Sequence, residues 1–506
     1  MIDNKKHSEK MLKLFELVAE LTDLSHISAV LGWDQQVNMP PGGSEERAMQ
    51  SAALGRIIHE KFATDEVGQL IADLEEEVGD LYAETDEARA VKVSKKFYEK
   101  QAKIPLPLLM ETIKTSSIAN EAWVKAKTQA DFSIFEPHLV KIVDLRKQYV
   151  ELYKPYDHVY DPLLDDFEPG MKTAEVIEIF DKLRPQQVQL LQEIAEKDPP
   201  DNSFIKQYYK EDYQEIFGRY VITCFGYDWD RGRLDVSPHP FTTEFGLGDV
   251  RITTRYLKED PGSAIFSTMH EAGHALYGQG LAEKYKRHPL RGAASLAIHE
   301  SQSRLWENII GRSQEFWTHF YPSLQMLFPE HLGNISVNDF YRGINKVEPS
   351  FIRVEADEAT YNLHIMLRLE IELGLMEGTI AVSDLPDIWN SKTQEYLGIT
   401  PPDDAHGVLQ DVHWSGGMIG YFPTYALGNL ASVQLWDKLL EEHPNVPDEI
   451  AQGKFESVLD WMGEHIHQYG GKYEPQEILL KATGAKLTPE PYLAYLQKKY
   501  SEIYGL

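Results

Sequence analysis

DPGSAIFSTMHEAGHALYGQG, residues 260–280, is the stretch from which the fold of this chain can be worked out. Asp260 can cap a helix and Pro261 is favoured in its first turn, so a helix is predicted to begin here. Inside it, residues 270–274 match the pattern HExxH. Residues four apart face the same way on an α-helix, so both histidines can bind one Zn²⁺ while Glu271 holds a water and accepts its proton.

The third ligand distinguishes the classes of HExxH site. A metzincin needs a glycine and a histidine where this chain has Tyr277 and Gly280, so that class is excluded. The other common set, two histidines and a glutamate, takes the glutamate from a following helix. A helix is predicted over 295–310 and carries Glu300, with Glu283 and Glu307 as competitors on spacing alone. The candidate ligands are His270, His274 and Glu300, with His299 as a supporting neighbour.

A β-hairpin is predicted just before this helix, over residues 241–256. Two stretches rich in threonine and β-branched residues are joined there by a Gly-Leu-Gly turn. Side chains alternate along a strand, so Asp249 and Arg251 share one face while Val250 and Ile252 take the other. The polar face would therefore lie beside the metal helix.

Helical periodicity dominates the rest of the chain. One apolar stripe near the amino terminus comprises Met11, Leu14, Phe15, Val18 and Leu21. Short Pro/Gly breaks separate such stretches, and we find no long Ser/Gly linker, low-complexity segment or fixed repeat. We therefore expect a mainly α fold with one catalytic helical domain over 1–506, in one body or in two lobes flanking a groove, and a zinc-site core at about 235–425.

Composition excludes several classes of partner. The 506 residues include 50 Lys+Arg and 80 Asp+Glu, a formal net charge of −30, so nucleic acid and anionic membranes are poor partners. No apolar run approaches the roughly 20 residues that cross a bilayer, and residues 1–13 show no secretory signal. Cys224 is the single cysteine and cannot close an intramolecular disulfide. These features predict a soluble, cytoplasmic protein.

Six motifs in order resemble the HExxH metallocarboxypeptidases typified by thermostable carboxypeptidase Taq, over nearly the whole chain. They are His239-Pro240-Phe241, Asp249-x-Arg251-x-Thr253, His270-Glu271-x-x-His274, His299-Glu300-Ser301-Gln302, Ile352-Arg353-x-x-Ala356-Asp357 and Gly407-x-x-Gln410-Asp411-x-His413-Trp414.

The resemblance implies a helical body with a deep substrate groove, similar to neurolysin and angiotensin-converting enzyme, and usually a homodimer. The HExxH set itself predicts one Zn²⁺ per subunit, and Co²⁺ is left open as a substitute. The resemblance strengthens Glu300 as the third ligand. It also implies release of single residues from the free C-termini of peptides, with broad side-chain tolerance and little activity on C-terminal proline.

An enzyme of this kind must recognise a free α-carboxylate, for which a buried arginine is the natural partner. Arg251, on the polar strand face beside Asp249, and Arg353 are the candidates. Arg353 precedes Asp357 by one helical turn, so Asp357 is predicted to hold its guanidinium. A structural ion pair is the alternative for either arginine.

Further substrate contacts are predicted downstream. If 403–414 is a helix, then His406, Gln410 and His413 share a face and can bind the peptide or the developing oxyanion. The other candidate substrate contacts are His239, Tyr421 and Tyr425.

Two further classes of function stay open on the sequence, in addition to the carboxypeptidase. An oligoendopeptidase or a dipeptidyl carboxypeptidase could use the same groove. A non-catalytic helical peptide-binding protein with a structural zinc is the third hypothesis, against which stand Glu271, which a structural site does not need, and a three-ligand set that leaves one coordination position open.

Overall fold

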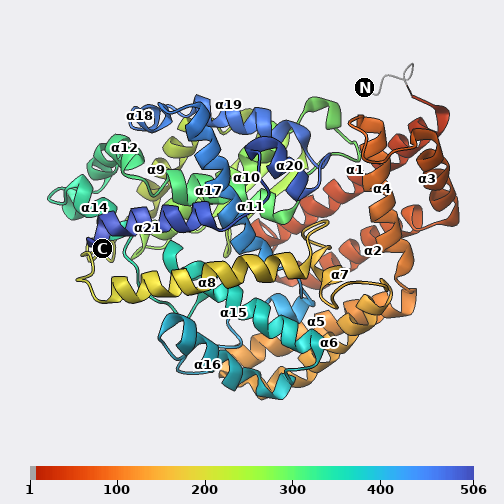
Figure 1. Ribbon diagram of the computed structural model, residues 1–506, viewed down its shortest axis with the longest axis horizontal. Helices are drawn as coiled ribbons and strands as arrows, with labels where there is room; N and C mark the ends of the chain where they lie inside the picture. Colours follow the sequence, from red (N-terminus) through yellow and green to blue (C-terminus); the bar gives the residue numbers. More distant parts are fainter. Residues whose placement is uncertain (1–6) are drawn as a thin grey trace.

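Helices build most of the protein, and the computed structural model describes residues 7–506 (Figure 1). The prediction that residues 1–13 contain no secretory signal therefore rests in part on residues 1–6, which lie outside the described residues. Within 7–506, no helix is both long enough and apolar enough to cross a membrane.

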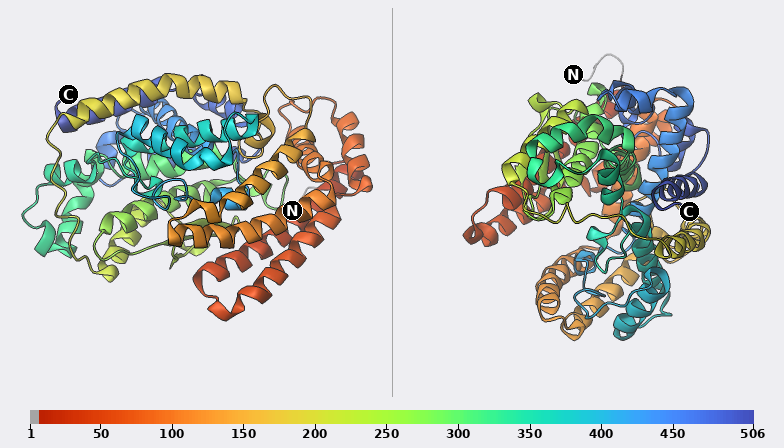
Figure 2. Two further views of the ribbon diagram at one scale, coloured as in Figure 1. Left: turned by 90° about the horizontal axis from the view of Figure 1, so that it is seen from below. Right: turned by 90° about the vertical axis from the view of Figure 1, so that its left-hand side faces the viewer.

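The amino-terminal helices have a hydrophobic core of their own. They are α1 (Glu9–Val37), α2 (Ser44–Phe62), α3 (Asp65–Val78) and α4 (Asp86–Lys103). The predicted stripe of α1 supplies Met11, Leu14 and Phe15 to this core, and Tyr285 and Leu290 join it from the middle of the chain. The far ends of α1 and α2 form a hairpin that projects from the body (Figure 2).

A larger core extends from Ala119 to Tyr504 and contains the helices that carry the predicted site. At its centre lie α10 (Pro261–Gly280), α11 (Leu296–Arg304), α15 (Glu358–Glu377) and α17 (Pro423–Glu442). The surrounding helices are α5 (Leu106–Gln129), α6 (Glu136–Glu151), α7 (Asp161–Leu164), α8 (Thr173–Ala195), α9 (Glu211–Cys224), α12 (Gln314–Leu327), α13 (Pro329–Leu332), α14 (Val337–Ile344), α16 (Leu385–Leu397), α18 (Val446–Ile450), α19 (Glu456–His465), α20 (Pro475–Thr483) and α21 (Glu490–Tyr504).

The helix that carries HExxH begins where the sequence predicts. The Asp260 carboxylate accepts a hydrogen bond from the Ser263 backbone N–H at 3.2 Å, and Pro261 occupies the first turn. The carboxylate thus satisfies one of the free N–H groups at the helix start, and proline needs no such partner. Most of α10 is buried, since it packs against β3, α9 and α11.

The predicted hairpin is present and belongs to a small mixed sheet. Strands β2 (Thr242–Gly246) and β3 (Asp249–Thr254) pair antiparallel, and Val250 and Ile252 are buried as the alternation predicts. Within the described residues, β1 (Leu234–Val236) adds a third strand, parallel to β3. The predicted antiparallel hairpin is therefore confirmed, and the added strand makes the sheet mixed. A three-residue strand is too short to show a periodic pattern, so the sequence did not indicate β1.

The helix predicted over 403–414 is not formed. The segment consists of turns followed by a 3₁₀ helix, His413–Gly416. Two of its carbonyl groups bond to α5 instead: Trp123 Nε1 donates to Leu409 O at 3.1 Å and Lys127 Nζ donates to Gln410 O at 2.8 Å. These tertiary hydrogen bonds replace the local i to i+4 bonds on which the sequence prediction depended.

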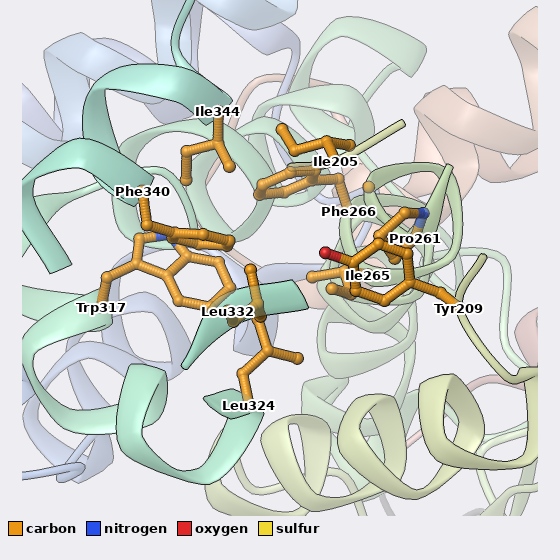
Figure 3. Close-up of a pocket in the computed structure, with 11 residues that line it drawn as sticks. Ile205, Tyr209, Pro261, Ile265, Phe266, Trp317, Leu324, Leu332, Phe340 and Ile344 are labelled. Atoms are coloured by element: carbon orange, nitrogen blue, oxygen red, sulfur yellow. The ribbon is translucent and has the colours of Figure 1, made fainter. Parts of the chain in front are cut away.

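An apolar cavity of about 20 Å³ lies at the amino-terminal end of α10 (Figure 3). Phe266 of α10, Trp317 of α12 and Phe340 of α14 contribute to its lining. Its walls are almost entirely apolar, so it is a small packing gap and does not suit a charged peptide terminus.

Candidate metal centre

The three predicted metal ligands meet between α10 and α11. The Nε2 atom of His270 lies 3.6 Å from Glu300 Oε2, and that of His274 lies 3.4 Å from the same oxygen. One donor atom from each residue lies within 4.8 Å of the others. Neither competing glutamate belongs to this group within residues 7–506.

Both histidines are held with Nε2 facing Glu300. His270 Nδ1 donates to Glu307 Oε2 at 2.8 Å, and His274 Nδ1 donates to the His299 carbonyl at 3.1 Å. These oxygens can only accept, so the proton lies on Nδ1 and the Nε2 lone pair is available to a metal. The His299 ring also stacks on His274, with centroids 4.1 Å apart. Two nitrogens and a carboxylate oxygen that converge in this way fit a divalent metal such as Zn²⁺.

Glu300 is kept ionised although it is buried. Burial raises the pKa of a carboxyl group, but the Arg304 guanidinium and the two histidines outweigh this effect and hold the pKa of Glu300 well below its usual range. Arg304 Nε donates to Glu300 Oε1 at 2.7 Å, which leaves Oε2 on the side of the histidines. A metal ligand must be deprotonated, so this environment suits the predicted role.

Glu271 is positioned by a threonine that the sequence did not single out. Thr242 Oγ1 lies 2.7 Å from Glu271 Oε2 and 2.9 Å from the carbonyl of the same residue. Thr242 begins β2, so the hairpin presses against α10 at the acidic residue of HExxH. Thr242 and Glu271 are 29 positions apart in the sequence, a separation over which local patterns do not predict a contact.

Arg353 is buried, but its predicted partner is wrong. Its Nη2 pairs with Asp411 Oδ1 at 2.8 Å, and its Nη1 donates to the Tyr361 hydroxyl at 2.8 Å. Asp357 instead caps α15, where Oδ1 accepts from the Ala359 N–H at 2.9 Å. α15 begins after residue 357, so Arg353 and Asp357 do not share a helix and the one-turn spacing does not apply.

Arg251 also lies in an ion pair, on the strand face that the alternation predicts. Its Nε and Nη2 each donate to Asp249 at 2.8 Å. The guanidinium carbon lies 4.5 Å from the centre of the Trp33 ring and 4.8 Å from that of Phe245. Arg251 therefore links α1 to the hairpin. Arg353 instead contacts Tyr361, whose ring lies against Arg304, the hydrogen-bond partner of Glu300.

Three of the downstream candidates, His413, Tyr421 and Tyr425, lie together. His413 stacks on Tyr421 with centroids 5.5 Å apart, and its Nε2 lies 3.5 Å from the Tyr425 hydroxyl. Burial lowers the pKa of His413 to about 3, so its ring is neutral at pH 7. Burial, with a smaller contribution from the Glu300 charge, raises the pKa of both tyrosines.

The remaining candidates do not form the predicted face. Gln410 donates to Phe351 O at 2.8 Å and accepts from the Arg353 N–H at 2.8 Å, so it supports the arginine. His406 is exposed and bonds Asp403 at 2.8 Å. His239 is exposed as well, and only its carbonyl accepts a hydrogen bond, from Ser237, among the described contacts. The shared face is lost because residues 403–414 are not helical.

α10 and α11 approach closely at Gly273, inside HExxH. A Cβ at this position would lie 2.7 Å from both Gln302 O and Ser303 Cα, which are backbone atoms. We expect Gly273→Ala to separate the helices, lower the free energy of unfolding by about 1–3 kcal/mol and weaken metal binding. Chelator competition and thermal unfolding measure both effects.

Gly463→Ala is the matched control for this substitution. Gly463 also lies within a helix, α19, but an added Cβ would meet no atom within 4 Å. It should leave metal affinity unchanged. If Gly273→Ala bound the metal as tightly as the wild-type protein, this result would contradict the close approach of the two helices.

Comparisons with known proteins agree with this geometry. The family model described as carboxypeptidase Taq (M32) metallopeptidase matches residues 13–500. Carboxypeptidase 1 of Bacillus subtilis is 41% identical over 495 residues, covering 98% of this chain and 98% of that protein. Thermostable carboxypeptidase 1 of Thermus thermophilus is 40% identical over 502 residues, covering 97% of this chain and 98% of that protein.

A solved structure extends the likeness to the whole fold. The crystal structure of M32 carboxypeptidase from Deinococcus radiodurans R1 matches with a TM-score of 0.95 at 36% identity, covering 99% of this chain and 100% of that chain. The family resemblance and the mainly α fold class seen in the sequence are thus confirmed. The chain belongs to the carboxypeptidase Taq (M32) metallopeptidase family and is a metallocarboxypeptidase.

Proposed function

We propose that this enzyme is a zinc-dependent carboxypeptidase that releases one residue at a time from peptides with a free C-terminus. His270, His274 and Glu300 would hold one Zn²⁺ per subunit, with Co²⁺ as a substitute. The observation that carries the proposal is the convergence of their three donor atoms, each fixed by a hydrogen bond on its far side. When bound, the metal supplies a Lewis acid that polarises the scissile carbonyl and makes water acidic enough to attack at neutral pH.

Glu271 would act as general base and then as general acid. Its carboxylate takes a proton from the attacking water and returns it to the leaving amine. Thr242 donates to one oxygen of this carboxylate at 2.7 Å and thereby limits its rotation. His413, Tyr421 and Tyr425 would lie beside the substrate and offer donors to the developing oxyanion.

Arg353 would bind the terminal α-carboxylate. Its guanidinium has donors beyond those that Asp411 and Tyr361 use, and the planar fork matches a carboxylate. Arg251 donates to Asp249 from Nε and Nη2, which form one edge of its guanidinium, and aromatic rings lie against its face, which favours a role in packing. An anchor near the metal restricts hydrolysis to the last peptide bond, which distinguishes this function from an oligoendopeptidase.

Other properties complete the proposal. Broad side-chain tolerance and poor release of C-terminal proline follow from the family resemblance, as do the homodimer and the deep groove. The single catalytic domain over 1–506, with its zinc-site core at about 235–425, is supported by the sharing of Tyr285 and Leu290 with the core of the amino-terminal helices. The net charge of −30 and the lone Cys224 support a cytoplasmic enzyme without nucleic-acid or membrane partners.

Mass spectrometry of a peptide digest tests the proposed function. An unblocked peptide should lose one C-terminal residue at each step, and the same peptide with an amidated C-terminus should stay intact because Arg353 has no carboxylate to bind. Loss of dipeptides would indicate a dipeptidyl carboxypeptidase, internal cuts an oligoendopeptidase, and no cleavage of either peptide a binding protein. Each of these three results would overturn the proposal.

A further inference from the structure

We propose that Arg304 is a positioning residue that locks the metal ligands to one another and to Arg353, acting through Glu307 and Tyr361. The proposal rests on the proposed function, in which His270 and Glu300 bind the metal and Arg353 binds the substrate carboxylate. It gives roles to three residues that the six sequence motifs do not contain.

One guanidinium, at the end of α11, is linked to α10 of the metal centre through a carboxylate. Arg304 Nε donates to Glu300 Oε1 at 2.7 Å, and its Nη1 donates to Glu307 Oε2 at 3.0 Å. The same Glu307 oxygen accepts from His270 Nδ1 at 2.8 Å. Arg304 therefore holds one proposed ligand directly and orients the second through a carboxylate.

The local backbone places Glu307 for this contact. Glu300, Arg304 and Glu307 are spaced i, i+4 and i+7, which share one side of a helix. A π-helix, Leu305–Ile310, begins directly after Arg304 and contains Glu307. π-helical turns are rare and frequently mark functional sites.

Tyr361 extends the connection to the substrate anchor. The Arg304 guanidinium carbon lies 4.4 Å from the centre of the Tyr361 ring. The hydroxyl of the same ring accepts from Arg353 Nη1 at 2.8 Å. A rigid aromatic side chain thus fixes the spacing between the carboxylate anchor and the metal ligands, and this spacing determines which peptide bond reaches the metal.

The alternative is a buried ion network that only stabilises the fold. Side chains of Glu300, Arg304 and Glu307 are 8%, 12% and 13% exposed, so any change here also affects folding. A stabilising network predicts a loss of stability alone. A positioning role predicts a specific loss of metal affinity in the folded enzyme.

Zinc affinity, measured by competition with a chromophoric chelator without substrate, tests the first part. Glu307→Gln keeps the size of the side chain but loses its charge, and Arg304→Lys keeps the charge but loses the fork that spans two carboxylates. Each should raise the dissociation constant for Zn²⁺ by about 10- to 100-fold. Circular dichroism confirms that each variant is folded, and Glu307→Gln decides the outcome if Arg304→Lys does not fold.

Arg89→Lys is the matched control. Arg89 is a buried arginine with a bidentate pair to Glu477, at 2.8 and 2.6 Å, in the amino-terminal helices. It should lower the Tm and leave the Zn²⁺ dissociation constant unchanged.

Tyr361→Phe tests the connection to Arg353. It keeps the ring under Arg304 and removes only the hydroxyl, so Zn²⁺ affinity should stay the same while KM for unblocked peptides rises and kcat changes little. Wild-type KM in this variant, or a weaker Zn²⁺ affinity, would remove Tyr361 from the proposal.

The outcomes separate the two proposals. If Glu307→Gln binds Zn²⁺ as tightly as the unchanged enzyme, the positioning role is wrong, while stepwise release of residues by the unchanged enzyme still supports the proposed function. If the unchanged enzyme does not bind Zn²⁺, the proposed function fails and the positioning role fails with it.

Discussion

Glu271→Gln should lower kcat by about 10²- to 10⁴-fold and leave the bound metal in place. The substitution keeps the shape of the side chain and an oxygen that can accept from Thr242 Oγ1, which lies 2.7 Å from Oε2 of Glu271. It removes the group that takes the proton from the attacking water. Glu271 is outside the group of three donors, so metal binding should not depend on it.

Steady-state kinetics on an unblocked peptide and metal analysis of the purified variant measure the two effects. Glu60→Gln is the control, because His59-Glu60 is a similar pair on α2 that is followed by Ala63 instead of a second histidine. Glu60 is exposed, so this variant should keep full activity and stability. Wild-type kcat in Glu271→Gln would refute the assignment of the general base.

Arg353→Lys should lower kcat/KM for peptides with a free C-terminus by about 30- to 5000-fold. The range corresponds to about 2–5 kcal/mol for disrupting a buried, hydrogen-bonded charge pair, at 1.36 kcal/mol per tenfold. Lysine retains the charge but cannot reach Asp411, Tyr361 and a substrate carboxylate in one plane. The difference in kcat/KM between free-acid and amidated peptides should therefore shrink, which kinetics on a matched peptide pair measures.

Folding must be separated from binding in this experiment. Removing Arg353 leaves Asp411 buried without its cation, and an uncompensated buried charge costs about 3–5 kcal/mol. The double variant Arg353→Met with Asp411→Asn removes both charges and should regain stability without regaining activity. Arg251 is the competing candidate for the carboxylate anchor. If Arg251→Lys removes the preference for free-acid peptides and Arg353→Lys does not, the anchor has been assigned to the wrong arginine.

The metal helices could be predicted because their signals are local. Asp260 and Pro261 start α10 by contacts within one turn, and the four-residue spacing of His270 and His274 fixes their common direction. Ser295 likewise caps α11, where its hydroxyl accepts from the Ile298 N–H at 3.1 Å. The spacing of Glu300, Arg304 and Glu307 was also readable, but nothing local indicated that Glu307 meets His270 instead of the metal.

The pairing around Arg353 could not be predicted in the same way. Asp411 lies 58 positions further along the chain, and the closer Asp357 was the better partner on helical spacing. The loop that carries Asp411 is held by Trp123 and Lys127 of α5, nearly 300 positions earlier. Local helix propensity in 403–414 was outweighed by these long-range hydrogen bonds.

The sequence by itself determined the family, the mainly α fold, the hairpin and the two helices that carry the candidate ligands. The tertiary structure decided the partners of those residues: Thr242 on Glu271, Glu307 on His270, and Asp411 and Tyr361 on Arg353. The physical reason is the distance along the chain between the interacting groups. Helix caps and i, i+4 spacings are set by neighbours within a turn, whereas a buried charge takes its partner from whichever segment the packed core brings within hydrogen-bond distance.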